Sequence, residues 1–220
     1  MRFALIGIPP KIESIRSGAG TNARRRICQL LEGTDMRTEQ VTTIWRSDGA
    51  IKNYKNALPI ILRAARKGDA LYQNLAGFCF ENGYGTERDL RQAKLWYSRA
   101  ARNGSITAMG NLALLYESGK GAKRSYVKAM KWYLAGAQQG SAWCQVNLGS
   151  IYARGTGTPV DMRSALMWWH KAAYQNDREA AYNLGVAFSD GEGVTKNEER
   201  ARYWKERSSS HEGGRRKSQI

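Results

Sequence analysis

The sequence lacks the residue patterns of a membrane-spanning, disulfide-bonded or metal-binding protein. No apolar run approaches the roughly 20 residues that a membrane helix needs. The chain has only three cysteines, Cys28, Cys79 and Cys144, and their spacing fits neither a zinc site nor a disulfide framework. We therefore expect no membrane partner, and we expect a reducing compartment, the cytoplasm.

Groupings of catalytic residues are also missing. The chain has two histidines, and His170 has no second histidine, cysteine pair or acidic partner at metal-ligand spacing. No Ser-His-Asp, Cys-His or paired-carboxylate arrangement can be recognised. We expect a protein that is not an enzyme and that needs neither a metal ion nor a cofactor.

Acidic residues are scarce relative to basic ones. The 220 residues include 35 lysines and arginines but only 19 aspartates and glutamates, which gives a formal net charge of +16. The excess is greatest in the middle of the chain rather than in a basic tail. A charge of this size implies acidic partners or a non-specific attraction to polyanions. Hydrophobic residues make up 42% of the chain, which is enough for a folded core.

What the chain does contain is a repeat of 36 residues, an interval typical of repeat arrays. Gly-x-Gly pairs start at Gly83, Gly119, Gly155 and Gly191. Tryptophan recurs at Trp96, Trp132, Trp168 and Trp204, and alanine at Ala57, Ala93, Ala129, Ala165 and Ala201. A phosphate-binding loop would occur once and continue into Lys-Ser or Lys-Thr, so we interpret the recurring glycines as turn residues.

Each repeat can be built from two helices, A and B. The residues suited to cap the start of helix B are Asp89, Ser125, Asp161 and Asn197. In helix B, alanine and tryptophan share one face, as Ala165 and Trp168 do. In helix A, alanine and leucine share one face, as Ala180 and Leu184 do. A single pair of helices cannot bury its apolar face, so stacked repeats must share a core. We therefore expect the four recurring tryptophans to pack inside it.

The combined motif resembles that of the Sel1-like repeat family, which is related to tetratricopeptide repeats. One repeat contains Asn147-Leu148-Gly149, Tyr152, Gly155, Gly157, Asp161, Ala165, Trp168-Trp169 and Ala172-Ala173. The resemblance covers about residues 53–207. It implies an all-α fold, a right-handed α-solenoid of about four helix-turn-helix repeats with a preceding half repeat and a concave binding surface.

The repeats divide the chain into segments. The half repeat, residues 53–68, contains helix B alone, and Pro59 within it should kink that helix or shift its start. The four repeats follow at residues 69–104, 105–140, 141–176 and 177–207. Outside the array lie an N-terminal extension, 1–52, which we expect to be irregular or partly disordered, and a polar tail, 208–220.

Three asparagines are the first candidate for a binding site. Asn111, Asn147 and Asn183 each precede the leucine of a helix A. By resemblance to tetratricopeptide repeats, they would face the concave groove and hydrogen-bond the backbone or terminal carboxylate of a peptide. Alternatively, they bond to neighbouring loops and hold the superhelix together. Trp143 and Arg154 complete the candidate groove, although Trp143 could instead fill space between repeats.

Basic clusters are the second candidate. Lys120, Lys123 and Arg124 form a basic loop, and Arg63, Arg66 and Lys67 stand at a helix end. Such clusters could bind an acidic peptide or nucleic acid. Alternatively, they are solvated surface charges, some of which stabilise the end of a helix through its dipole.

The sequence favours a non-catalytic scaffold for protein–protein interaction, with a partner protein or peptide of acidic character in the concave groove. The main alternative is nucleic-acid binding through the basic surface, which predicts a steep and sequence-tolerant salt dependence. A third alternative, β-lactam hydrolysis, comes from the resemblance to cysteine-rich Sel1-like proteins. This chain lacks the paired cysteine in each repeat that marks those proteins.

Overall fold

The computed structural model describes residues 50–209, with side chains from Lys55 onwards. Within this range the chain is helical, without a strand. The helices are α3 (Ala50–Arg66), α4 (Ala70–Asn82), α5 (Leu90–Arg102), α6 (Ile106–Ser118), α7 (Tyr126–Gln138), α8 (Ala142–Arg154), α9 (Met162–Ala173), α10 (Arg178–Asp190) and α11 (Glu198–Ser209). Our expectations for residues 1–49 and 210–220 concern segments outside the described residues.

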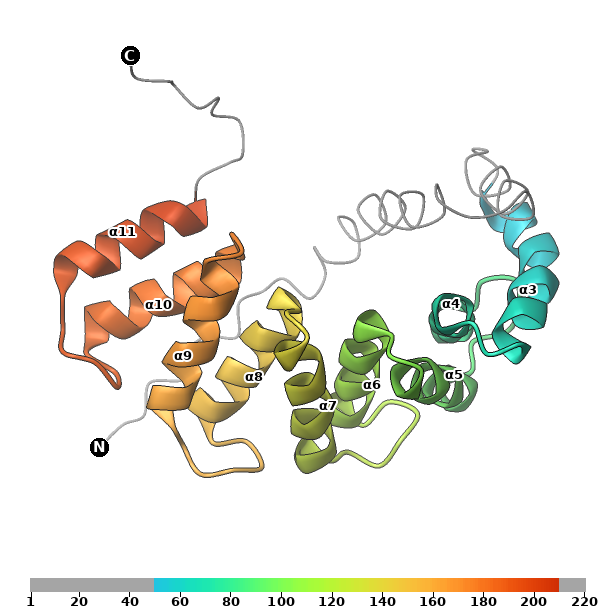
Figure 1. Ribbon diagram of the computed structural model, residues 1–220, viewed down its shortest axis with the longest axis horizontal. Helices are drawn as coiled ribbons and strands as arrows, with labels where there is room; N and C mark the ends of the chain where they lie inside the picture. The colour runs from blue at the N-terminus through green and yellow to red at the C-terminus, as the bar shows by residue number, and fades with distance from the viewer. Residues whose placement is uncertain (1–49, 210–220) are drawn as a thin grey trace, which may run out of the picture.

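The helices pack in chain order along a curved path that is open on one side (Figure 1). We call α4, α6, α8 and α10 the A helices, and α3, α5, α7, α9 and α11 the B helices. Each A helix packs against the B helix before it and the B helix after it. The predicted all-α solenoid is thus confirmed. None of the helices in residues 50–209 is both long enough and apolar enough to cross a membrane.

Short polar side chains determine where the helices begin. As predicted, the side chains of Asp89, Ser125 and Asp161 accept backbone amide hydrogen bonds in the first turns of α5, α7 and α9. Asn197 caps α11 in the same way, accepting from the amide of Arg200 at 2.8 Å. The A helices have equivalent caps that we did not predict, at Asp69, Ser105, Ser141 and Asp177.

The two glycines of each Gly-x-Gly pair have different roles. The first ends the A helix in the left-handed conformation, with φ between 63° and 77°, at Gly83, Gly119, Gly155 and Gly191. The second also has positive φ, and at Gly121, Gly157 and Gly193 it lies against the B helix of the preceding repeat. A Cβ atom on Gly157 would lie 2.6 Å from that of Tyr126, and one on Gly193 would collide with Met162. The interpretation of these glycines as turn residues is therefore confirmed.

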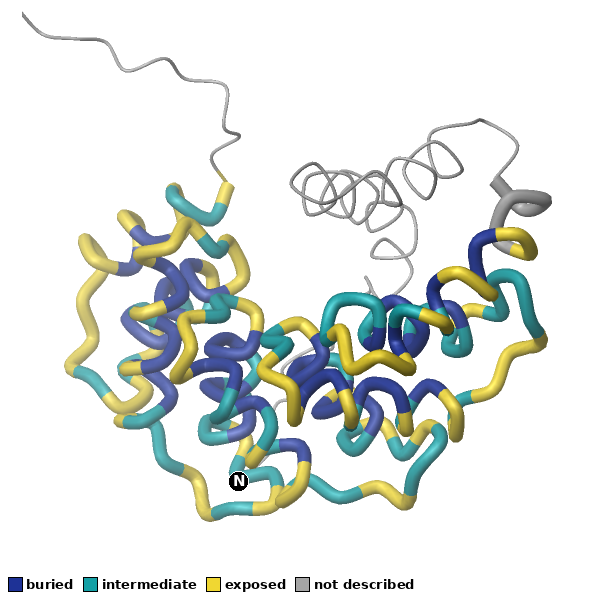
Figure 2. The backbone as a smooth tube through the Cα atoms, turned by 45° about the vertical axis from the view of Figure 1, so that its right-hand side comes forward, coloured by how far each residue is buried: buried dark blue, intermediate teal, exposed yellow. Residues whose placement is uncertain are grey.

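The recurring tryptophans join one repeat to the next. Trp96, Trp168 and Trp204 are only 5–7% exposed, and each packs in a core cluster with residues of the preceding B helix. Trp132 is half-buried against the cluster between α5 and α6. Figure 2 shows that buried residues continue through the interior of the whole arc. The predicted packing role of the tryptophans is confirmed.

The first described helix differs from the predicted half repeat. Helix α3 begins at Ala50, three residues before the predicted start of the half repeat. Pro59 also lies within α3, and it is exposed. Proline removes one helical hydrogen bond, because it has no amide hydrogen. Solvent on the exposed side of α3 can hydrate the carbonyl group that loses this bond, so the helix continues through Pro59.

Candidate binding surfaces

The three predicted asparagines occupy the same position in α6, α8 and α10 but have different partners. Asn111 donates an Nδ2 hydrogen bond of 3.1 Å to Oδ1 of Asn74, which joins α6 to α4. Asn147 donates to the carbonyl of Trp143 in its own helix at 2.8 Å. Asn183 is half-buried, and the described residues provide no hydrogen-bond partner for its side chain. Asn111 therefore helps to hold the superhelix together, while peptide binding by the three asparagines stays a prediction.

Trp143 lies against the preceding A helix and also reaches solvent. Its ring is so close to Gly110 that any side chain at that position would collide with it. It meets the ring of Tyr133 edge to face, with centroids 6.2 Å apart. Trp143 is nevertheless 39% exposed. It fills space between repeats and presents the rest of its ring at the surface.

Arg154 belongs to a small network between repeats. Its Nη2 atom lies 3.4 Å from Oε1 of Glu117, while the hydroxyl of Tyr133 donates a 2.9 Å hydrogen bond to Oε2 of Glu117. The Arg154 side chain is 60% exposed. Because exposed ion pairs contribute less than about 1 kcal/mol to stability, Arg154 can give up this pair for a ligand at small cost.

The A helices also expose apolar side chains beside these residues. Leu114 on α6 and Tyr182 on α10 are 42% and 56% exposed. We call Asn111, Leu114, Trp143, Asn147, Tyr182 and Asn183 the A-face. Each is the second, fifth, sixth or ninth residue of its A helix, and these positions share one side of a helix. The A-face thus combines amide groups with apolar surface.

Charge is distributed unequally between the two kinds of helix. The four A helices contain two basic and four acidic residues, whereas the five B helices contain 16 basic and three acidic residues. The net charge along the chain does not reveal this difference, because A and B helices alternate. The basic character of the described residues therefore comes mainly from the B helices.

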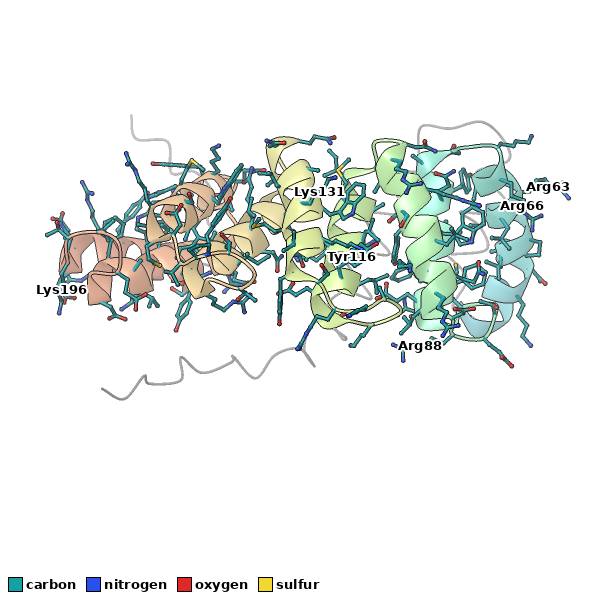
Figure 3. All side chains as sticks on the ribbon, turned by 90° about the horizontal axis from the view of Figure 1, so that it is seen from below. Arg63, Arg66, Arg88, Tyr116, Lys131 and Lys196 are labelled. Atoms are coloured by element: carbon teal, nitrogen blue, oxygen red, sulfur yellow. The ribbon has the colours of Figure 1, made fainter. Side chains whose placement is uncertain are left out.

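The predicted basic clusters are spread out along the solenoid. Lys120, Lys123 and Arg124 are exposed in the loop between α6 and α7. Figure 3 shows further cations at one end of the solenoid, Arg63 and Arg66, at the opposite end, Lys196, and between them, Lys131. The clusters predicted from the sequence therefore lie apart from one another along the solenoid.

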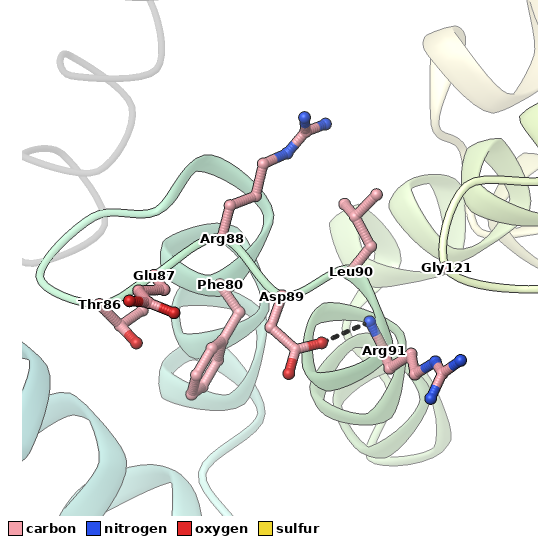
Figure 4. Close-up of a pocket in the computed structure, with 8 residues that line it drawn as sticks. All are labelled: Phe80, Thr86, Glu87, Arg88, Asp89, Leu90, Arg91 and Gly121. Atoms are coloured by element: carbon pink, nitrogen blue, oxygen red, sulfur yellow. Dashed lines mark hydrogen bonds between the residues drawn. The ribbon is translucent and has the colours of Figure 1, made fainter.

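One open pocket lies where the loop before α5 meets the next loop, at Gly121 (Figure 4). Two of its polar side chains, Asp89 and Arg88, form hydrogen bonds with the backbone. Oδ1 of Asp89 accepts a 2.8 Å hydrogen bond from the amide of Arg91, which caps α5. Nε of Arg88 donates to the carbonyl of Glu81 at 3.0 Å. The pocket therefore follows from helix capping and loop packing.

Two buried glutamines, which we did not predict, link successive B helices. Gln73 donates to the carbonyl of Ala65 on α3 at 3.1 Å and accepts from Asn103, just after α5, at 2.9 Å. Gln145, two repeats later, links α7 to Gln175 after α9 in the same way, at 3.1 and 2.8 Å. Both glutamines are 4% exposed. Their recurrence at twice the repeat length is the signal in the sequence that could have predicted them.

His170 belongs to an aromatic cluster at the junction of α9, α10 and α11. Its ring centroid lies 5.4 Å from that of Trp204 and 6.4 Å from that of Phe188. Its Nδ1 atom is buried and has no hydrogen-bond partner in residues 50–209. Burial and the charge of Arg200 lower the pKa of His170 below its ordinary value of 6.5. The described part of the chain brings no three His, Cys, Asp or Glu side chains together as metal ligands.

The two described cysteines are core residues. Cys79 and Cys144 are fully buried. Burial raises the pKa of the Cys79 thiol to about 12, and it also raises that of Cys144. Since the thiolate is the reactive form of cysteine, neither side chain is suited to act as a nucleophile at neutral pH.

Several solved structures resemble this chain. A protective antigen of uropathogenic Escherichia coli with an SLR fold is 34% identical, with a TM-score of 0.68, and the match covers 69% of this chain and 32% of the antigen. A Sel1 repeat protein from Oxalobacter formigenes is 33% identical, with a TM-score of 0.65, covering 70% of this chain and 63% of that one. The match thus spans about a third of the antigen and under two thirds of the Oxalobacter protein.

A more distant structure supports the fold alone. A Sel1 repeat protein from Klebsiella pneumoniae subsp. pneumoniae is 22% identical with a TM-score of 0.51, covering 84% of this chain and 91% of that one. No curated protein matches the chain significantly.

The family model of the Sel1 repeat matches the chain four times, at residues 70–105, 106–141, 144–177 and 178–211. Each matched segment contains an A helix, whole or nearly so, and the B helix that follows it. The four segments make up more than half of the sequence. With the two similar structures above 30% identity, these matches show that the chain belongs to the Sel1 repeat family.

Proposed function

We propose that this Sel1 repeat protein is a non-catalytic scaffold that binds a segment of a partner protein on its A-face. Sel1 repeats generally mediate protein–protein interactions, and the family is typically non-catalytic. The observation that carries the proposal is the exposure of Leu114, Trp143 and Tyr182 on successive A helices. Apolar side chains that recur on one side of a rigid array favour a protein-binding surface.

The amide groups of the A-face supply the polar part of such a site. An asparagine can both donate to and accept from a peptide backbone, so it can fix the register of an extended segment. Asn183 is the most available of the three, because Asn111 and Asn147 already donate hydrogen bonds within the solenoid. Apolar contacts supply most of the affinity, since aromatic anchors dominate the binding energy of typical interfaces.

The charge distribution favours an apolar, weakly charged partner segment on the A-face. The A helices contain few charged residues, and acidic residues outnumber basic ones among them. An acidic segment would gain little attraction there. The preference for acidic partners that the net charge implies therefore does not extend to this surface.

The test is partner capture with a surface variant. We expect Leu114→Ser combined with Tyr182→Ser to abolish retention of proteins from a nuclease-treated native lysate at moderate salt. Both side chains are exposed, so the variant should fold, which circular dichroism and thermal melting can verify. Asn183→Ala should weaken capture less, because it removes a hydrogen bond but no apolar surface.

The matched control is Val127→Ser combined with Val160→Ser. Both valines are 63% exposed and lie outside the A-face, so this variant loses a comparable amount of apolar surface. Capture should persist in the control. The proposal fails if the control loses its partners while the A-face variant retains them.

A further inference from the structure

On two of the B helices, exposed cations lie one turn before and one turn after an exposed large hydrophobic side chain. In α5, Arg91, Leu95 and Arg99 are all exposed and stand four residues apart, so they form one ridge along the helix. Leu95 is 41% exposed. Arg91 is also one of the residues that line the pocket near Gly121 (Figure 4). We call these three residues the α5 ridge.

The same arrangement returns two repeats later. In α9, Arg163, Met167 and Lys171 are exposed at the equivalent positions, with Met167 45% exposed. We call them the α9 ridge. In α7, the equivalent residues are Val127, Lys131 and Ala135. The pattern is thus specific to certain B helices and is not a general consequence of the repeat.

Tryptophan holds the last cation of each ridge in place. The guanidinium of Arg99 lies 4.8 Å from the centroid of the Trp96 ring, and Nζ of Lys171 lies 4.3 Å from that of Trp168. Both tryptophans are buried core residues with fixed positions. The cations are therefore partly ordered before a ligand binds, which reduces the entropy lost on binding.

The composition of the ridges favours a protein ligand over a nucleic acid. The phosphate backbone of a nucleic acid is bound by cations, and it gains nothing from Leu95 or Met167. Stacking on bases would need exposed aromatic rings at these positions instead. Arginine and methionine are both enriched at protein interfaces. Spacing by four residues also matches the side-chain rows of a partner helix.

We propose that the α5 and α9 ridges form a second interaction surface, which binds an acidic helical segment with carboxylates one turn before and after an apolar side chain. Each carboxylate would pair with a cation of the ridge, and the apolar side chain would contact Leu95 or Met167. This surface is separate from the A-face, so it would take the acidic partner that the net charge implies.

The test uses a synthetic helical peptide in which glutamate, leucine and glutamate recur at intervals of four residues. A peptide of identical composition with altered spacing is its control. We expect the first peptide to bind at least about tenfold more tightly at moderate salt, since only its spacing matches the ridges. Fluorescence anisotropy of the labelled peptides measures both affinities.

Two variants separate the contributions of charge and apolar contact. Arg91→Gln with Arg163→Gln should weaken binding by about tenfold, and so should Leu95→Ser with Met167→Ser. The matched control is Lys120→Gln with Lys123→Gln, which removes the same charge from a loop outside the ridges and should change affinity less than about twofold. The A-face variant Leu114→Ser with Tyr182→Ser should bind the peptide normally. A failure of the ridge proposal is therefore distinguishable from a failure of the A-face proposal.

Three outcomes would overturn this proposal. If both peptides bind equally, or if the loop and ridge charge variants lose affinity equally, the surface attracts anions without recognising them. Duplex DNA and vesicles containing an anionic lipid serve as parallel probes. Tighter binding of either probe at moderate salt, unaffected by Leu95→Ser with Met167→Ser, would assign the basic surface to nucleic acid or to lipid.

Discussion

The third and fourth repeats both have glycine after the leucine of the A helix, but this glycine packs against different residues of helix B. In the third repeat, Gly149 lies against Trp169, which is 7% exposed in the core shared with α10. In the fourth repeat, Gly185 lies against Lys205, whose side chain is exposed. The same position in helix B is therefore a core residue in the third repeat, where another repeat packs against it, and a surface residue in the last of the described repeats.

The buried glutamine that links successive B helices shows the same contrast between the third and fourth repeats. Gln145 in α8 joins α7 to Gln175, whereas the equivalent residue of α10 is Ala181. Helix α11 carries three acidic and four basic residues, while α9 carries two basic residues and no acidic one. A polar outer helix keeps the end of a repeat array soluble. The difference teaches that neighbouring repeats, and not the repeat motif alone, determine which positions are buried.

The largest expected effect on stability comes from adding one methyl group to Gly149, and the same change at Gly185 is its control. The Cβ of Gly149→Ala would lie 2.6 Å from the Trp169 ring, and Trp169 also donates a hydrogen bond to the carbonyl of Val146. We expect this variant to lower the free energy of unfolding by about 2 kcal/mol. Urea unfolding of the folded chain measures it.

The matched variant is Gly185→Ala. Its nearest contact is Cγ of Lys205, at 2.7 Å, and that flexible side chain can move into solvent. The higher helix propensity of alanine, about 1 kcal/mol over glycine, should offset the remaining strain. We expect stability to change by less than about 1 kcal/mol. Equal losses in the two variants would contradict the contrast between the repeats.

A smaller effect is expected from Gln145→Ala. The substitution removes two hydrogen bonds in a buried site, although the Ala137 carbonyl still accepts from the amide of Gly140 at 3.1 Å and the Gln175 amide still donates to the carbonyl of Lys171 at 3.4 Å. Each hydrogen bond contributes about 0.5–1.5 kcal/mol to stability, and we expect a loss of about 1.5 kcal/mol because both groups keep a second partner. The reverse change in the last repeat, Ala181→Gln, should not increase the stability of the protein. Thermal melting compares the two, and a stabilised Ala181→Gln would contradict the prediction.

The smallest expected effect is a pH dependence at the junction of these repeats. The pKa of His170 is lowered below its ordinary value of 6.5 in the folded protein. As the pH falls below about 6.5, the unfolded chain binds a proton that the folded chain resists, so stability is lost until the pH passes the folded pKa. His170→Phe keeps a ring in the cluster and should reduce the loss of stability between pH 7 and pH 5. An unchanged pH profile would contradict this role.

Local features of the fold could be predicted because their causes are local. The caps at Asp89, Ser125 and Asp161 and the turn glycines each act on backbone groups within a few residues. The caps of the A helices also act locally, and serine before the apolar run at Ser105 and Ser141 is a signal from which these caps could have been predicted. The start of α3 was predicted three residues late, because the prediction followed the register of the repeat, in which residue 53 is equivalent to the caps Asp89 and Ser125.

The candidate site was less predictable, since its partners lie far apart in the sequence. The repeat motif places Asn111, Asn147 and Asn183 at equivalent positions, but only Asn111 has an asparagine opposite it, Asn74. The role of Trp143 depends on Gly110, a position that is occupied by larger residues in the other A helices. Such pairs become visible only when neighbouring repeats are stacked.

The sequence by itself determined the period, the helices and the family. A repeat of 36 residues specifies caps, turns and a continuous apolar face, and these can be satisfied only by stacking. Only the tertiary structure decided which chemistry shares a surface. The 16 basic residues of the B helices and the apolar and amide groups of the A-face alternate along the chain. Stacking separates these two groups of residues, because it brings equivalent positions of successive repeats together. Residues of the A helices are then grouped with one another, and so are residues of the B helices.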